Sequence, residues 1–153
     1  MRKKSASSFS HLSASGEAKM VNVAHKPEQS RRAVAEGFIR CAAKTTKLLK
    51  EQALPKGDVF SVARIAAIQG AKSTATLIPL CHPLPIHGIE IKLKLEGGGV
   101  RIRATVETIG KTGVEMEALT AVSIAALTIY DMCKAVDKGM VIESVRLVEK
   151  IKS

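Results

Sequence analysis

Residues 113–134 read GVEMEALTAVSIAALTIYDMCK, and the rest of the chain is organised around this stretch. Its interior, residues 118–130, carries no charged side chain, which predicts a buried helix. At 1.5 Å per residue this interior gives about 20 Å of helix, whereas roughly 20 apolar residues are needed to cross a bilayer. Thr120, Ser123 and Thr128 also interrupt its apolar character. We therefore expect the core helix of a soluble protein.

Charged residues mark both ends of this helix. Glu115 and Glu117 stand at its start, and Asp131 and Lys134 at its end. Glu117 and Asp131 are fourteen positions apart, which returns them almost to the same face but separates them by about 21 Å along the axis. One helix cannot bring both to a small substrate, whereas two antiparallel copies related by a two-fold axis can. The hypothesis is a site shared between subunits.

A plainer interpretation of these end residues stays open. Two carboxylates at a helix start are favoured by the positive end of the helix dipole, whatever their function. Asp131 and Lys134, at positions i and i+3, also have the spacing of an ordinary surface ion pair.

Composition limits the classes of function. The chain has 153 residues, a formal charge of +10, no Trp, one Tyr and three Phe. The length suits a single domain, which we expect over residues 17–153, after a flexible basic tail at residues 1–16. Anions are the favoured partners, but there are too few aromatic side chains for stacking on single-stranded nucleic acid.

The cysteines and the tail bear on the cellular compartment. Cys41, Cys81 and Cys133 have no metal-type spacing, so reduced thiols in the cytoplasm are expected and no metal is predicted. The tail is basic and rich in Ser but lacks the apolar run of a secretory signal. An organelle-targeting role for this tail is the open alternative.

Periodicity along the chain predicts an α+β fold. The pattern strand, helices, strand, strand, helix, strand is that of a ferredoxin-like α/β sandwich, with an antiparallel sheet packed by helices on one face. The expected elements are a strand at 20–23, a helix from Pro27 to about Lys50, a helix at 59–72 capped by Asp58, an irregular proline-rich stretch at 76–85, a hairpin of strands 86–96 and 100–109, the helix described above, and a strand at 140–148.

Four segments carry a resemblance to a known family. They are KGDVF from Lys56, LIPLCHPL from Leu77, GKTGVEMEALTA from Gly110, and AALTIYDMCKAVDKGMVI from Ala125. These segments closely resemble cyclic pyranopterin monophosphate synthases, the second enzymes of molybdenum cofactor biosynthesis. The resemblance implies conversion of a cyclised dihydro-GTP intermediate, made by a radical-SAM partner enzyme, into cyclic pyranopterin monophosphate and diphosphate. It implies no cofactor or metal.

The resemblance also implies site residues and an assembly. A homohexamer built as a trimer of dimers, with active sites at subunit boundaries, is expected. His82 lies in a loop held extended by prolines, which suits phosphate contact or proton transfer near neutral pH. The implied catalytic residues are Asp131, Lys56, Lys134, His82 and Glu117, and the implied substrate-binding residues are Leu80, Cys81, His82, Met116, Glu117 and Glu115, with Lys72 and Lys150 as weaker candidates.

The chain departs from the family pattern at residue 22. The family usually has an acidic residue where this chain has Asn22, so a structural role and unaltered activity are expected there. The rival is a basic α/β-plait module that binds nucleic acid through the hairpin residues Lys92, Lys94, Arg101 and Arg103. A membrane partner is not expected.

Overall fold

The computed structural model describes residues 11–153, so residues 1–10 of the expected tail lie outside the described residues. Helices and strands follow one another in the order that the ferredoxin-like pattern requires: strand, helices, strand, strand, helix, strand. In chain order they are β1 (Gln29–Arg40), α1 (Ala43–Lys50), α2 (Val59–Lys72), α3 (Thr74–Leu77), β2 (Gly88–Glu96), β3 (Gly99–Gly110), α4 (Glu115–Cys133) and β4 (Val141–Lys152).

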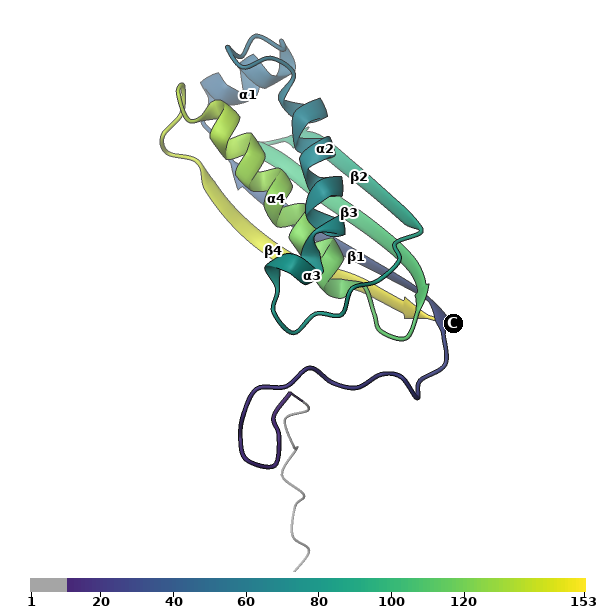
Figure 1. Ribbon diagram of the computed structural model, residues 1–153. Helices are drawn as coiled ribbons and strands as arrows, with labels where there is room; N and C mark the ends of the chain where they lie inside the picture. Colours follow the sequence, from purple (N-terminus) through teal and green to yellow (C-terminus); the bar gives the residue numbers. More distant parts are fainter. Residues whose placement is uncertain (1–10) are drawn as a thin grey trace, which may run out of the picture.

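The four strands form one antiparallel sheet with the spatial order β2-β3-β1-β4. Helices α2 and α4 lie side by side over one face of this sheet (Figure 1). This two-layer arrangement confirms the ferredoxin-like α/β sandwich predicted from the sequence.

Helix α4 is the central element of the core. In a search of residues 11–153 it is the one helix long and apolar enough to span a membrane. Ten of its 19 residues are buried, however, and it contacts α2, β1, β3 and β4. Its apolar side chains are therefore used in packing on the sheet, as predicted for a core helix.

The helix predicted from Pro27 to Lys50 is wrong over its first half. Residues 29–40 form strand β1, which pairs with β3 on one side and β4 on the other, and only α1 at its end is helical. Along β1 the buried Ala33, Ala35 and Ile39 alternate with residues of the opposite face. Alanine gives a weak hydrophobic signal, so this period of two contributed little to the pattern. The larger side chains Val34, Phe38 and Cys41 recur at steps of three and four residues, which indicated a helix.

The strand predicted at residues 20–23 is also absent. These residues belong to no strand or helix, and the Val21 carbonyl oxygen instead accepts a hydrogen bond from the His82 side chain. Asn22 accepts a hydrogen bond from the Ala24 amide at 2.8 Å, a structural role that an acidic residue could equally perform.

The remaining predicted elements are confirmed. Helix α2 has the predicted limits, and the Asp58 side chain caps it by accepting from the Ser61 amide at 3.0 Å. The hairpin is present as β2 and β3, and β4 extends four residues beyond the predicted end at residue 148. The proline-rich stretch is irregular apart from the short helix α3.

Gly37 allows α4 to lie close to the middle of β1. A Cβ atom at residue 37 would lie 2.6 Å from Cγ1 of Val122 on α4 and 3.3 Å from Cγ2 of Val145 on β4. Val122 is fully buried and cannot move freely, because the interior is close-packed, whereas Val145 is exposed. The absence of a side chain here therefore sets how closely α4 approaches the sheet.

We predict that Gly37→Ala lowers the free energy of unfolding by about 1–3 kcal/mol, because the new methyl group overpacks the helix–sheet contact. Adding Val122→Ala to Gly37→Ala should recover part of this loss, although Val122→Ala alone is destabilising. Urea denaturation of the single and double variants measures the coupling. Gly97→Ala, whose Cβ meets no atom within 4 Å, is the control. Additive effects of the two substitutions would contradict the proposed contact.

Candidate active site

Most of the expected site residues gather in two clusters at opposite ends of α4. The first lies at the start of the helix and lines a cavity of about 460 Å³. The second lies at the end of the helix and consists of Lys56, Asp131 and Lys134. Since α4 is a regular helix from Glu115 to Cys133, Glu117 and Asp131 are about 21 Å apart along it, as predicted.

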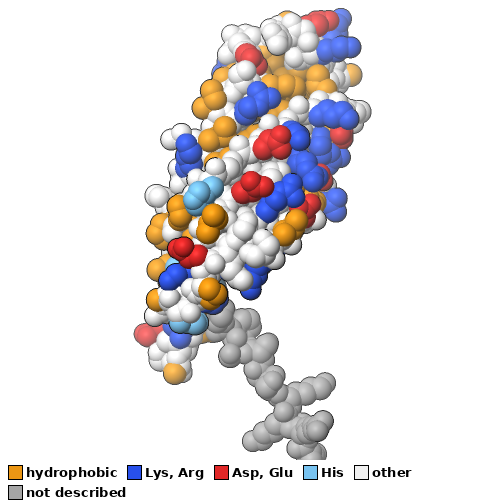
Figure 2. All heavy atoms as spheres, turned by 90° about the vertical axis from the view of Figure 1, so that its right-hand side faces the viewer, with side chains coloured by type: hydrophobic (Ala, Val, Ile, Leu, Met, Phe, Trp, Pro, Cys, Tyr) orange, Lys and Arg blue, Asp and Glu red, His pale blue; other side chains and the backbone are white. Residues whose placement is uncertain are grey.

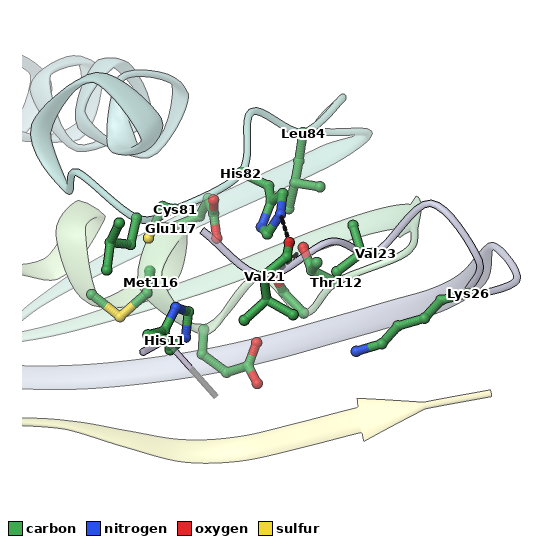
Figure 3. Close-up of a pocket in the computed structure, with 13 residues that line it drawn as sticks. His11, Val21, Val23, Lys26, Cys81, His82, Leu84, Thr112, Met116 and Glu117 are labelled. Atoms are coloured by element: carbon green, nitrogen blue, oxygen red, sulfur yellow. Dashed lines mark hydrogen bonds between the residues drawn. The ribbon is translucent and has the colours of Figure 1, made fainter. Parts of the chain in front are cut away.

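The cavity at the start of α4 contains most of the expected substrate-binding residues (Figure 3). Three chain segments form it: the irregular loop after α3, the turn leading into α4 together with the first turn of that helix, and the segment before β1. Its thirteen lining residues are His11, Val21, Val23, Lys26, Leu80, Cys81, His82, Leu84, Thr112, Gly113, Glu115, Met116 and Glu117.

Glu117 is the buried acid of this cavity. Its side chain belongs to the first turn of α4, and the residue is only 4 % exposed. Burial raises the pKa of the Glu117 carboxyl, and the nearby charge of Glu115 raises it further, against the lowering effect of a backbone hydrogen bond. The pKa of the Cys81 thiol is also raised, by burial and by the charge of Glu117. Glu117 therefore retains a proton more readily than an exposed glutamate.

His82 is oriented by the segment before β1. Its Nε2 lies 2.6 Å from the carbonyl oxygen of Val21. Because a carbonyl oxygen only accepts hydrogen bonds, Nε2 must carry the proton in this arrangement. The other ring nitrogen, Nδ1, then accepts a proton or a hydrogen bond in the neutral ring.

The turn into α4 is held by two cations. Arg31 on β1 donates from Nε to the Gly110 carbonyl at 3.0 Å and from Nη2 to the Lys111 carbonyl at 3.2 Å. Lys150 on β4 forms an ion pair with Glu115. The predicted candidate Lys150 thus reaches the edge of the first cluster through Glu115, although it does not line the cavity.

The second cluster is a carboxylate held between two lysines. Lys134 Nζ lies 2.7 Å from one Asp131 oxygen, and Lys56 Nζ lies 3.0 Å from the other. Hydrogen bonding to Lys134 and then to Lys56 lowers the pKa of Asp131, while Asp131 raises the pKa of Lys134. All three side chains are about half exposed, so a ligand can reach them from solvent.

Lys72 belongs to neither cluster. It lies at the end of α2 and lines a separate groove with Ile68, Ile86 and His87. The structure thus brings together most of the substrate-binding candidates and, separately, the three residues of the Asp131 cluster. Among residues 11–153 no group of three or more His, Cys, Asp and Glu side chains is placed to hold a metal ion.

Sequence reasoning missed part of the cavity wall. His11, Val21, Val23 and Lys26 line it, although the first lies in the expected tail and two others in the wrongly predicted strand. The available signal was the Ser-Ala-Ser-Gly stretch at residues 13–16, which is typical of a tight turn. Such a turn folds the chain back instead of leaving it as a tail.

A protein-family model matches most of the chain. The model of the MoaC family matches residues 20–153, which include both clusters and every strand and helix of the fold. Members of this family are enzymes of molybdenum cofactor biosynthesis. With a match over most of its length, the chain belongs to the MoaC family.

Proposed function

We propose that the protein is a cyclic pyranopterin monophosphate synthase, a lyase. It converts the cyclised intermediate (8S)-3',8-cyclo-7,8-dihydroguanosine 5'-triphosphate into cyclic pyranopterin monophosphate and diphosphate. The observation that carries the proposal is a cavity in a MoaC-family chain where the buried acid Glu117 lies with His82 and Cys81. The cavity volume of about 460 Å³ suits a small-molecule ligand. The net charge of +10 favours a triphosphate.

The proposed reaction opens one ring, closes others and needs repeated proton transfers, which groups with shifted pKa values can supply. Glu117, whose pKa is raised, is suited to deliver a proton inside the cavity. Asp131 raises the pKa of Lys134 and so keeps its side chain charged as an ammonium group. Lys134 is proposed as a proton carrier from the family resemblance, with Asp131 setting its charge state. Lys56 shares the same carboxylate and is proposed as a second proton carrier.

The anionic part of the substrate needs its own contacts. His82 is proposed to hold phosphate or to relay a proton through Nδ1. Lys150 is proposed to help disperse the charge of the departing diphosphate, because its ion pair with Glu115 holds it next to the cavity. Lys72 enters the proposal only through the family resemblance.

Both clusters can act on one substrate only if two chains contribute. Within a chain they are held about 21 Å apart by α4, so we propose that the Glu117 end of one subunit faces the Asp131 end of its partner. Val62 and Ile65 on α2 and Leu127 on α4 are exposed apolar side chains, which a second subunit could cover.

The wider context of the proposal follows from the family. We propose a homohexamer assembled as a trimer of dimers, working in the cytoplasm on the product of a radical-SAM enzyme. The catalytic unit is proposed to be one domain over residues 17–153. The buried residues of its helices and strands form one connected core, which supports this proposal.

The nucleic-acid-binding rival has less support. The hairpin cations lie among carboxylates: Lys92 pairs with Glu90 at 3.2 Å, and Arg101 pairs with Glu96 at 3.1 Å. Arg103 also forms an ion pair, with Glu36 on β1. Figure 2 likewise shows acidic side chains beside the basic ones on one side of the molecule. A phosphate backbone would have to displace these carboxylates from their partners.

We predict that the protein, incubated with the cyclised GTP intermediate, releases diphosphate and a pterin product. Glu117→Gln should lower turnover by about 100-fold or more, because the amide cannot transfer a proton. Chromatography detects the pterin product and a diphosphate assay detects the released diphosphate, for the wild type and for Glu117→Gln. A wild-type protein without turnover would contradict the proposed function, and full turnover by Glu117→Gln would remove Glu117 from the chemistry.

The same substitution should stabilise the fold at neutral pH. The pKa of Glu117 is raised in the folded state, so the folded protein binds the proton more tightly than the unfolded chain. The stability of the wild type therefore falls as the pH rises through the folded-state pKa of Glu117. A glutamine does not titrate, so Glu117→Gln does not lose stability in this way. We predict that the Tm of Glu117→Gln exceeds that of the wild type at pH 8 and that the gap narrows at pH 5. A gap independent of pH would contradict a raised pKa.

Mixing two inactive variants tests the shared site. Glu117→Ala and Asp131→Ala chains, each folded and inactive alone, should regain about a quarter of wild-type activity after subunit exchange. Random exchange makes half of the dimers mixed, and one of the two sites in each mixed dimer is intact. Differently tagged chains, purified together, show that exchange has occurred. Exchanged oligomers that remain inactive would contradict the shared site.

A further inference from the structure

One wall of the cavity comes from the segment before β1, which we call the arm and define as residues 11–26. Four of the thirteen lining residues belong to it: His11, Val21, Val23 and Lys26. The family match begins at residue 20, so His11 lies outside the part of the chain that this match covers. The cavity thus includes a side chain whose role neither the family match nor the proposed chemistry assigns.

A tight hairpin places His11 at the cavity. Leu12 pairs with Ala18 in an antiparallel bridge, and the Lys19 amide donates to the His11 carbonyl at 2.9 Å. Gly16 has φ +83, in the left-handed region that glycine adopts without strain, and its amide donates to the Ser13 carbonyl at 3.0 Å. Residue 11 joins this hairpin through its backbone, so its imidazole is not needed for the turn.

The rest of the arm is attached to the cavity wall by two side chains. His82 donates to the Val21 carbonyl at 2.6 Å, and Lys111 Nζ donates to the Ala24 carbonyl at 2.8 Å. His82 belongs to the loop after α3, and Lys111 belongs to the turn into α4. The arm therefore runs past the cavity with a fixed register, and the hairpin carries His11 to the Met116 end while Lys26 lies at the other (Figure 3).

The lining of the cavity contains both acidic and basic side chains. Its acidic lining residues are Glu115 and Glu117, both in the first turn of α4, and Glu117 is buried. The arm contributes His11 and Lys26, which are exposed at the rim. A phosphate group is repelled by the carboxylates, whereas imidazole and ammonium groups can donate charge-assisted hydrogen bonds to it. His11 lies beside Met116, close to these two acids, but Glu115 is paired with Lys150. His11 and Lys26 are the side chains of the arm that can donate to a phosphate chain in this cavity.

We propose that His11 is a substrate-binding residue whose imidazole contacts the phosphate chain of the nucleotide-derived substrate, and that the arm is a built-in wall of the site. The proposal rests on the proposed function for the identity of the substrate. It deepens that function by assigning phosphate recognition to a residue that precedes the family-matched part of the chain.

The test compares His11→Ala with His25→Ala, a matched control in the same arm that does not line the cavity. Titration calorimetry with inorganic diphosphate and with GTP measures binding, and steady-state kinetics with the cyclised intermediate measures KM and kcat. Loss of a charge-assisted hydrogen bond should weaken binding of both probes roughly 10- to 100-fold in His11→Ala. KM should rise by a similar factor with little change in kcat. His25→Ala should match the wild type, and His11→Lys should recover part of the affinity.

The outcomes separate this proposal from the proposed function. Loss of diphosphate binding only in His11→Ala supports a phosphate role for His11. This holds even if the wild type does not turn over the cyclised intermediate, because that result would contradict only the proposed function. Wild-type affinity in His11→Ala, equal losses in both histidine variants, or no diphosphate binding by the wild type would each overturn the proposal. A structural role alone predicts that His11→Lys is as impaired as His11→Ala.

Discussion

The packing of α4 on the sheet is the constraint on which the rest of the structure depends. Its buried face contacts three strands and α2, and Gly37 lets it lie close to β1. A helix fixed in this way cannot bend to bring its two ends together. The acid at its start and the ion-paired cluster at its end are therefore held apart by about 1.5 Å per intervening residue.

The two ends differ electrostatically because they differ in burial. Glu117 is enclosed, so its protonated form is favoured, whereas Asp131 is exposed between two lysines and stays ionised. One end thus offers a proton-holding carboxyl in a cavity, and the other offers ammonium groups organised around a carboxylate. A reaction with several proton transfers needs groups of both kinds, which gives a chemical reason for the proposed site shared between two subunits.

Much of the fold was readable from the sequence where one pattern dominated. The uncharged run of α4, the Asp58 cap of α2 and the alternation in the hairpin all specify their elements locally. Strand β1 was misread because Ala33, Ala35 and Gly37 contribute little to a hydrophobic pattern and become buried only through pairing on both sides. The gathering of Leu80, Cys81, His82 and Glu117 was expected from the resemblance, but the arm was not. Its position depends on distant partners, such as His82 and Lys111, which no local pattern encodes.

A crystal structure of the assembled protein with bound GTP tests the proposed site shared between subunits. We predict that one ligand lies within hydrogen-bonding distance of His82 or Glu117 from one chain and of Lys134 or Lys56 from its neighbour. An assembly in which the Asp131 cluster of every chain faces solvent, remote from the Glu117 cavity of all other chains, would contradict it.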